Sequence, residues 1–417
     1  MDFENHKRQV LIVVENLPVP LDRRVWLEAT SLVEKGYQVS VICPMGRGWT
    51  EAYEEIQNVH IYRYPEPVEA HSGAIAYAKE YSHFLWHMFR LARKVRRERG
   101  FQVIHGCNPP DLAFLLALRY RLSGVRYLFD HHDVCPELFE AKFGKKGLLH
   151  KVMLWWERMT FACADVSIAT NQSFRRIAIT RGKMDPEDVF VVRSAPKLDN
   201  FKPGPGKRDY RKGAKTVFGY VGVIGQQEGM DLLVMAAEHL IQTLGHKDVH
   251  FVIVGFGPQL PEVEADVASR GLSDYFTFTG ALFGADMLDA LNATDIGLSP
   301  DPKNAMNDIS TMNKVMEYMT LEKPVVQFDL TEGRASAEEA SLYAKANDPV
   351  DFADKIAWLI DNPEKAAEMG KLGAQRVQQN LSWQHSVPHL LAAYERAFSK
   401  QETRAEAASM NSQRGRT

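Results

Sequence analysis

The chain has 417 residues, of which 45% are hydrophobic, 25% charged and 10% aromatic, and its formal net charge is −3. This length predicts two domains, each able to bury a core without disulfides or structural metals. The charge excludes a global basic field, so we expect no nucleic-acid partner. The four cysteines (Cys43, Cys107, Cys135 and Cys163) form no CxxC pair and are typical of reduced thiols in a cytoplasmic protein.

The first fifty residues predict a strand, a helix and a second strand. Residues 10–14 form an apolar run of the length of a strand buried on both faces. Apolar residues then recur at helical spacing over 25–33, and Gly36 stands where that helix should end. A second apolar run follows at 39–43. This order indicates a right-handed βαβ unit in a parallel sheet.

The alternation continues and predicts an α/β protein with two Rossmann-like domains. Further strands are expected at 103–106, 127–130, 166–169 and 189–192, with helices at 111–122 and 148–163. A second series has strands at 217–221, 251–254, 276–279, 296–298 and 325–328, with a helix from Met230. We place a first domain at 1–201, a Pro-, Gly- and Lys-rich linker at 202–215, a second domain at 216–381, a final helix at 382–400 and a disordered tail at 401–417.

Ligands of open parallel sheets bind beyond the carboxyl ends of the strands, so the residues that follow each strand carry the functional information. Asp22, Arg23 and Arg24 follow the first strand and open a helix, where the arginines could bind an anionic acceptor. Alternatively, Asp22 caps the helix and the arginines form surface ion pairs. Spacing alone does not separate these interpretations.

Four titratable residues end the strand at 127–130. His131 or His132 could donate a hydrogen bond to a sugar hydroxyl, with Asp133 fixing the histidine tautomer. A metal site is a weaker alternative, because adjacent ligands have no partner motif. A purely structural role is the third interpretation.

Glycines follow two strands of the second domain. Gly222, Val223 and Gly225 form a turn before a helix, and 255–258 (GFGP) is placed similarly. Glycine lets the backbone approach a pyrophosphate, although any tight strand–helix turn also favours it.

The densest pattern is NDISTMNKVMEYMTLEKP at 307–324. Ser310 and Thr311 suit a helix N-cap, and Lys314 and Glu317 follow on nearly one face. A helix N-terminus with a lysine suits a phosphate, and a carboxylate suits a ribose diol. A capped amphipathic helix is the structural alternative.

Membrane contact is a separate question. No apolar run approaches the roughly 20 residues of a bilayer span. His83–Arg99 combines aromatic and aliphatic residues with a basic end, which suits an interfacial helix near anionic lipid. A helix that covers the sheet with a solvated basic end explains the pattern equally well. We expect a cytoplasmic protein, peripheral at the inner face of the membrane under the first interpretation.

Four motifs together resemble family 4 of the retaining glycosyltransferases, which have the GT-B fold and include polysaccharide-assembly enzymes. They are LPVPLDRRVWLEATSLVEKGYQVSVICP, VIHGCNPPD, FDHHDVCPEL and STMNKVMEYMTLEKPVV. The resemblance spans about 10–398. It implies two parallel sheets facing one another across a cleft and a final helix that returns to the N-terminal domain.

The resemblance also implies a role for each domain. The second domain would hold a nucleotide-diphosphate sugar, with uridine expected from family frequency. The first would hold the acceptor, a glycan, a lipid-linked sugar or a small molecule, through Asp22, Arg23, Arg24, His131 and Asp133. Catalytic roles fall on His132 near the donor sugar, Lys314 at the diphosphate and Glu317 at the ribose. Donor contacts fall on Gly222, Val223, Gly225, Thr279, Gly280, Leu282, Ser310, Thr311, Met312 and Asn313. The family needs neither a cofactor nor a metal.

Two departures stand out. The first of the family's paired glutamates falls on Ile309, with Asp308 and Ser310 as candidate substitutes. The basic residues expected after the glycine turn are replaced by 226–228 (QQE), so Lys314 and backbone amides carry more of the diphosphate. A GT-B epimerase and a non-catalytic nucleotide-sugar-binding protein remain alternatives. A dinucleotide oxidoreductase is disfavoured, because no GxGxxG motif with a downstream acidic residue follows either first strand.

Overall fold

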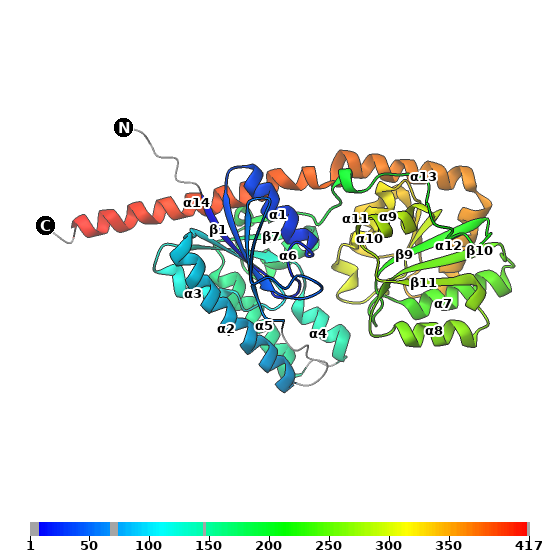
Figure 1. Cartoon of the computed structure of the whole chain (residues 1–417), viewed down its shortest axis with the longest axis horizontal. Helices are drawn as coiled ribbons and strands as arrows, with labels where there is room; N and C mark the ends of the chain where they lie inside the picture. Colours follow the sequence, from blue (N-terminus) through cyan, green and yellow to red (C-terminus); the bar gives the residue numbers. More distant parts are fainter. Residues whose placement is uncertain (1–7, 67–73, 145–146, 415–417) are drawn as a thin grey trace. The chain divides into compact units, whose positions relative to one another are not determined.

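The computed structural model describes residues 8–66, 74–144 and 147–414. The chain separates into two compact units. The first comprises Met1–Glu140, Lys145–Val192 and Val387–Thr417, and the second comprises Ala141–Gly144 and Arg193–Ser386. Each unit is built on one sheet (Figure 1).

The first unit has a sheet of eight strands in the order β3-β4-β2-β1-β5-β6-β7-β8. Its strands are β1 (Gln9–Val13), β2 (Gln38–Pro44), β3 (Tyr53–Ile56), β4 (Val59–Tyr64), β5 (Val103–Cys107), β6 (Arg126–His131), β7 (Val166–Ala169) and β8 (Val189–Val191). Its helices are α1 (Arg23–Glu34), α2 (Ala74–Glu98), α3 (Phe114–Arg121), α4 (Cys135–Phe143), α5 (Leu148–Cys163), α6 (Gln172–Thr180) and most of α14 (Trp383–Arg414). All pairings are parallel except that of β3 with β4.

The two faces of the first sheet have different coverings. Ile104 of β5 belongs to a core cluster with residues of α2, α3 and α5. Its neighbour His105 points to the opposite face, because successive strand residues alternate, and there it contacts Tyr394 of α14. The C-terminal helix therefore packs on the N-terminal sheet, as the resemblance implies (red helix in Figure 1).

The second unit has a six-stranded sheet in the order β11-β10-β9-β12-β13-β14, with all pairings parallel. Its strands are β9 (Thr216–Val223), β10 (Val249–Phe256), β11 (Phe276–Gly280), β12 (Ile296–Ser299), β13 (Val325–Phe328) and β14 (Ser341–Ala344). Its helices are α7 (Met230–Glu238), α8 (Leu260–Ser269), α9 (Gly284–Asn292), α10 (Asn313–Thr320), α11 (Thr331–Ala337), α12 (Pro349–Asp361) and α13 (Pro363–Arg376). The predicted α/β class with two parallel-sheet units is confirmed.

Two sequence-based expectations are corrected, and three strands are added. The segment 202–215 lies in the second unit, which begins at Arg193. Two aspartates of the second unit hold it there. Asp289 of α9 accepts a hydrogen bond from the Lys207 N–H at 2.5 Å, and Asp295, directly before β12, pairs with Arg211. The tail is helical to Arg414, since its Ala-, Glu- and Arg-rich sequence favours helix. The strands β3, β4 and β14 were not predicted.

The helix α2 contains most of the segment His83–Arg99, for which we considered membrane contact. Phe84 and Met88 are buried in the core of the first unit, and Leu85 and Phe89 pack against it. Trp86 is 62% exposed, beside the Arg90 guanidinium. The helix therefore covers the sheet with most of its apolar side chains. Within the described part of the chain, no helix combines the length and apolarity that crossing a bilayer requires.

Candidate active site

The helix α1 places Asp22, Arg23 and Arg24 in three different environments. Asp22 is the N-cap and accepts from the Val25 N–H at 3.0 Å. Arg23 is exposed, whereas Arg24 is buried. The Arg24 guanidinium donates to both carboxylate oxygens of Asp130, at 3.0 and 2.7 Å, and to the Val192 carbonyl at 2.7 Å. The cap interpretation is confirmed for Asp22, and Arg24 forms a buried ion pair rather than a surface one.

Asp130, at the end of β6, is the centre of a buried group that we call the Asp130 cluster: Arg24, Glu28, His105, Asp130, His132 and Tyr394. His105 Nε2 lies 3.3 Å from Asp130 Oδ2, and His105 Nδ1 shares a 2.7 Å hydrogen bond with the Tyr394 hydroxyl. His132 Nε2 donates to the same Asp130 oxygen. Because Asp130, not Asp133, binds the His132 ring, the expectation that Asp133 fixes the tautomer is corrected.

The main charges of this cluster, the Arg24 cation and the Asp130 anion, compensate one another. Burial opposes ionisation of Asp130, but Arg24 and the two histidines hold its pKa well below the usual range. Burial raises the pKa of Glu28 well above its usual range, with Arg24 opposing and Asp130 adding to the effect. Burial also lowers the pKa of His105. Near neutral pH the Arg24 cation and the Asp130 anion therefore compensate one another, with Glu28 and His105 neutral.

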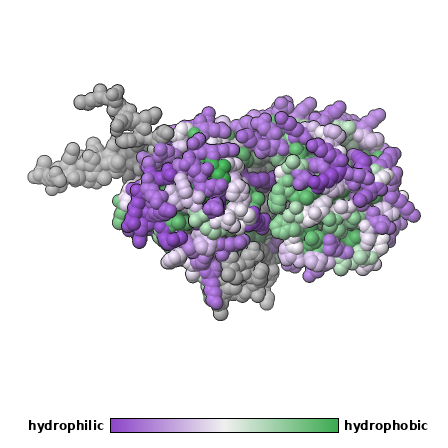
Figure 2. All heavy atoms as spheres, viewed as in Figure 1, coloured by the Kyte–Doolittle hydropathy of each residue, from purple (hydrophilic) through white to green (hydrophobic). Residues whose placement is uncertain are grey.

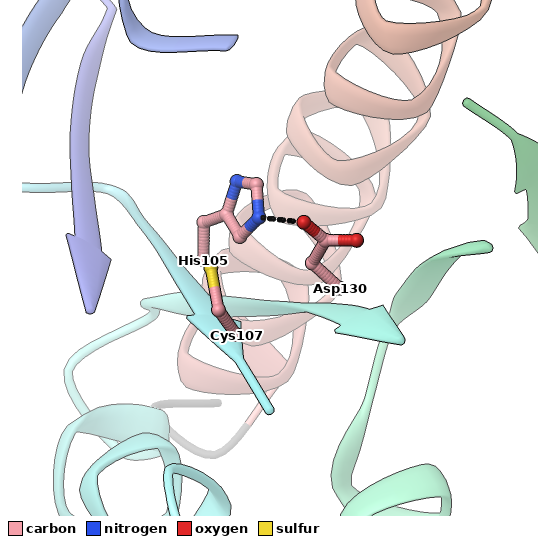
Figure 3. A group of neighbouring side chains, drawn as sticks. All are labelled: His105, Cys107 and Asp130. Carbon is pink, nitrogen blue, oxygen red and sulfur yellow. Dashed lines mark ion pairs between the residues drawn. The ribbon is translucent and has the colours of Figure 1, made fainter. Parts of the chain in front are cut away.

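Two triads of the first unit have ligand atoms close enough to hold a metal ion: His105–Cys107–Asp130 and Glu28–Asp130–His132. Figure 3 shows the first, in which Cys107 is the strand-register partner of Asp130. Both triads depend on Asp130, whose two oxygens already bind the Arg24 guanidinium. An arginine cation in that position opposes a second cation on the same carboxylate, so we assign the cluster a structural role.

His131 is a core residue. Its ring is fully buried, with ring centroids 4.8 Å from Phe174 and 5.3 Å from Phe161. Burial, with the nearby Arg181 charge, lowers its pKa to about 3. The expected acceptor contact of His131 is therefore corrected, because no part of the side chain reaches the surface. His132 and Asp133 are partly exposed, and the Asn108 carboxamide oxygen accepts from both of their backbone N–H groups, at 2.7 and 3.1 Å.

Close approach of neighbouring backbone segments explains the glycines at the carboxyl edge of the second sheet. A Cβ on Gly255 would lie 1.9 Å from the Gly222 carbonyl oxygen, so β9 and β10 can approach only with glycine there. Gly229 has φ +65° and its Cβ position is 2.1 Å from the Pro300 carbonyl oxygen. The GFGP segment is thereby accounted for by packing, and it holds the Gly222–Gly225 turn in place.

Lys314 lies in the first turn of α10, beside this turn. Its Nζ donates to both oxygens of Asp301, at 2.9 and 3.0 Å, and lies 4.6 Å from the centroid of the Tyr220 ring. The Lys314 Cε is 3.6 Å from the Cβ position of Gly222. Ser299 donates to Asp301 at 2.5 Å. Lys314, Asp301, Tyr220 and Glu228, described below, form what we call the Lys314 cluster.

The helix α10 begins later than the sequence indicates. Met312 is the N-cap and makes no side-chain cap hydrogen bond. Ser310 instead donates to the Met306 carbonyl at 2.8 Å. The predicted Ser310–Thr311 cap is therefore wrong, because Met312 occupies the N-cap position and the Ser310 hydroxyl bonds to Met306 instead. Glu317, one turn further along, is 5% exposed.

Asp308, a candidate substitute for the family's first glutamate, is engaged by other residues of the second unit. Its carboxylate accepts from the Thr331 N–H at 2.9 Å and from the Thr331 hydroxyl at 3.1 Å, and pairs with Lys303. Burial opposes ionisation, but these partners lower its pKa. Of the remaining donor candidates, Thr279 donates to the Gly280 carbonyl at 2.9 Å, and Leu282 packs on a core cluster.

The sequence analysis did not single out four residues that make key contacts in these two regions: His105, Asn108, Asp301 and Tyr394. Asp301 follows β12 and Asn108 follows β5, so the rule that strand ends carry ligands could have found both. His105 lies inside a strand and Tyr394 far along the chain on α14, and no local pattern connects them.

Comparison with known proteins assigns both units. A model described as glycosyltransferase family 4 matches residues 21–195, and one described as glycosyl transferases group 1 matches 215–362. The chain belongs to glycosyltransferase family 4. Both the family and the GT-B fold expected from the sequence motifs are thereby confirmed.

Relatives of this glycosyltransferase transfer or assemble sugars. A 2-deoxystreptamine glucosyltransferase from Streptomyces kanamyceticus is 27% identical over 74% of this chain and 81% of its own length. An alpha-maltose-1-phosphate synthase from Mycolicibacterium smegmatis is 25% identical over 66% and 73%. The fold is similar to that of sucrose-phosphate synthase from Thermosynechococcus elongatus, with a TM-score of 0.74 and 17% identity over 94% of this chain and all of that one. Anabaena HepE, solved with UDP, has a TM-score of 0.69 and 13% identity over 93% and 99%.

Proposed function

We propose that this glycosyltransferase moves a sugar from a nucleotide-diphosphate sugar to an acceptor hydroxyl, with retention at the anomeric carbon and without a metal ion. The observation that carries the proposal is the juxtaposition of the Gly222–Gly225 turn with Lys314, whose Cε lies 3.6 Å from the Cβ position of Gly222. A glycine turn, a helix N-terminus without a side-chain cap and a lysine together suit a diphosphate.

Uridine is the base that we propose. HepE, which shares the fold, has been solved in complex with UDP-glucose. In this chain, exposed apolar side chains stand at or just after the carboxyl ends of β9, β10 and β11: Val223, Phe256 and Phe283 are 52%, 40% and 57% exposed. Such side chains offer a packing surface for a nucleobase. We assign Glu317 to the ribose hydroxyls, because its buried carboxylate lies one turn after Lys314 on the same helix.

The proposed step breaks the bond between the anomeric carbon and the diphosphate oxygen, which keeps the electron pair. The acceptor oxygen bonds to the same face of that carbon, and its proton passes to the departing diphosphate. Lys314 and the N–H groups at the start of α10 stabilise the charge that develops on the phosphate oxygens. We assign acceptor contacts to the first unit, with Arg23 and Asp133 as the accessible candidates after the exclusion of Arg24 and His131. His132, which is partly exposed, keeps its proposed role near the donor sugar. The acceptor is a glycan, lipid-linked or small-molecule hydroxyl in polysaccharide or glycoconjugate synthesis.

A thermal-shift screen tests the donor assignment. The glucose conjugates of UDP, GDP, ADP and dTDP are compared with and without magnesium, using the wild type, Glu317→Ala and the exposed-site control Glu264→Gln. Binding to the folded state raises Tm by mass action. We expect a magnesium-independent shift with UDP-glucose that the control keeps and Glu317→Ala loses. No shift with any nucleotide would overturn the donor site.

A second measurement addresses catalysis itself. Release of UDP from a UDP-sugar, followed over time, should be detectable without acceptor as slow hydrolysis, and NMR of a transferred product should show the anomeric configuration of the donor. Binding without turnover would identify a nucleotide-sugar-binding protein. An inverted product would contradict retention while leaving the donor site intact.

A further inference from the structure

Glu228 occupies an unexpected place in the glycine turn of the second unit. It follows Gln226 and Gln227 directly before Gly229, where the family resemblance predicts basic residues. Its side chain folds back over the turn, since Oε2 lies 2.9 Å from the Cβ position of Gly225. That oxygen is buried and makes no hydrogen bond within the described part of the chain. A buried oxygen of this kind is costly unless a partner arrives.

The backbone of the turn that carries Glu228 is held by contacts on both sides. The buried Asn307 carboxamide donates to the Gln227 carbonyl at 2.8 Å and to the Pro302 carbonyl at 2.9 Å. Gly229 packs on the Pro300 carbonyl, as described above. These contacts hold the main chain on both sides of Glu228 and so fix where its side chain begins.

Among the described residues, no nearby cation is free to neutralise an ionised Glu228, because the Lys314 ammonium is already paired with Asp301. Lys314 of α10 and the backbone N–H groups of Gly225 and Glu228 favour its ionised form, whereas Asp301, after β12, opposes it. The Tyr220 hydroxyl of β9 faces the same group. Lys314 and Asp301 are bonded to one another and nearly cancel. Burial is the largest influence and raises the pKa of Glu228. An ionised Glu228 would add a negative charge beside the dianionic diphosphate, whereas a protonated one would offer a donor.

A divalent cation is the other way to reconcile a carboxylate with a diphosphate. Asp301 would be the natural second ligand, but both its oxygens bind Lys314 and one also accepts from Ser299. Glu228 alone is a poor divalent-cation site. A proton on the carboxyl group therefore fits the described contacts better than a metal ion does.

We propose that protonated Glu228 donates a hydrogen bond from Oε2 to the diphosphate of the nucleotide sugar and so makes donor binding depend on a proton. This inference rests on the proposed donor site. It assigns Glu228 the positioning contact that a basic residue makes elsewhere in the family. When Glu228 is ionised before binding, the complex takes up one proton, so affinity falls as pH rises through the pKa of the free side chain.

Calorimetric titration of UDP-glucose over about pH 5.5 to 8.5 tests this, because the diester-like diphosphate of a nucleotide sugar keeps its charge in that range. The wild type should lose up to about tenfold in affinity per pH unit above the pKa of Glu228. Glu228→Gln, which keeps a donor of the same shape, should bind at every pH as the wild type does at the lowest. Glu228→Ala should bind more weakly than Glu228→Gln and without the pH dependence, and Glu264→Gln should follow the wild type.

Three outcomes overturn the inference. A wild-type affinity that does not depend on pH would show that binding involves no proton on Glu228. A Glu228→Gln protein that is weaker than the wild type at every pH shows that the carboxylate itself is the contact. Binding that needs magnesium in the wild type and is lost in Glu228→Gln makes Glu228 a metal ligand. Failure of the donor site looks different, because then the wild type and Glu264→Gln bind none of the UDP, GDP, ADP and dTDP conjugates of glucose, and this inference falls with it.

Discussion

The Asp130 cluster and the Lys314 cluster both lie at the carboxyl ends of parallel strands, yet they differ in how their charges are satisfied. Asp130 is fully buried and has three partners on the protein, Arg24, His105 and His132. The Lys314 cluster is built instead on one lysine–carboxylate pair, Lys314 with Asp301. Each cluster also holds a carboxyl group with at least one buried oxygen that makes no hydrogen bond among the described residues, Glu28 in the first and Glu228 in the second. Position at a strand end is thus common to both, and they differ in enclosure: every member of the Asp130 cluster except His132 is buried, whereas Glu228 is partly exposed beside the glycine turn where we propose that the donor binds.

The largest expected effect is on the folding of the first unit. Arg24→Leu removes the only arginine on Asp130 among the described contacts and leaves a buried, uncompensated carboxylate. We expect a loss of about 3–5 kcal/mol in the free energy of unfolding. Arg176→Leu on the exposed face of α6 serves as the control and should change it by less than about 0.5 kcal/mol. Equal losses in urea titrations of the two variants would show that the Asp130 cluster is not a structural core.

The second prediction concerns ligand binding. Lys314→Met keeps an aliphatic stem over the Tyr220 ring and removes the ammonium group. Affinity for UDP-glucose should fall about 10- to 100-fold, since a hydrogen bond to a charged group is worth about 1.5–3 kcal/mol. Calorimetry measures the affinity and urea unfolding the stability, which should fall less than in Arg24→Leu. Lys371→Met, exposed on α13, is the matched control. Unchanged affinity in Lys314→Met would end the contrast between the clusters.

A smaller loss should follow from removing one hydroxyl. Tyr394→Phe leaves His105 Nδ1 buried without its 2.7 Å partner. An unsatisfied buried polar group costs about 1–3 kcal/mol. Urea unfolding measures this, and nucleotide affinity should stay unchanged because the donor candidates lie in the second unit. A cost below about 0.5 kcal/mol would mean that the α14 contact contributes packing alone.

The smallest effect at neutral pH belongs to His131. The folded protein holds its pKa at about 3, whereas the unfolded chain takes up a proton near pH 6.5. Stability attributable to this group is therefore complete at pH 7.5 and is lost as pH falls below about 6.5, by at most about 1.4 kcal/mol per pH unit. His131→Phe should flatten the dependence of unfolding free energy on pH between about 6.5 and 4.5. An unchanged slope would contradict the burial argument, whatever the absolute stability of the variant.

Strong apolar runs made the fold predictable from the sequence. The central strands β1, β2 and β10 are continuous and almost wholly buried, and β9 is buried over 217–220, so their period and length identify them. The strands β3 (YEEI) and β14 (SLYA) are four residues long and lie at the edges of their sheets. Segments so short and mixed carry too little pattern, and only pairing with a neighbour defines them.

The place of each candidate residue in the fold was predictable from the sequence, whereas its partners were not. His132, Lys314 and Glu317 could be located because each follows a strand or opens a helix after one. Pairing could not be read from spacing: Arg24 and Asp130 are 106 positions apart, so nothing local indicates that Arg24 is buried rather than free for an acceptor. The prediction of the α10 N-cap failed for a related reason, because the Ser310 hydroxyl donates to the Met306 carbonyl instead of accepting from the helix.

The helix α14 has a consequence for the order in which the protein can be made. It begins in the second unit, where the Ser386 hydroxyl donates to the Arg193 carbonyl, and continues into the first, where Tyr394 meets His105 from 289 positions away. The ribosome therefore releases the whole second unit before it releases the helix that completes the first sheet. During synthesis the face of the first sheet around His105 therefore stays uncovered until the residues from Val387 onward emerge. We expect nascent chains ending before Val387 to mature the second unit first, although the first was translated earlier.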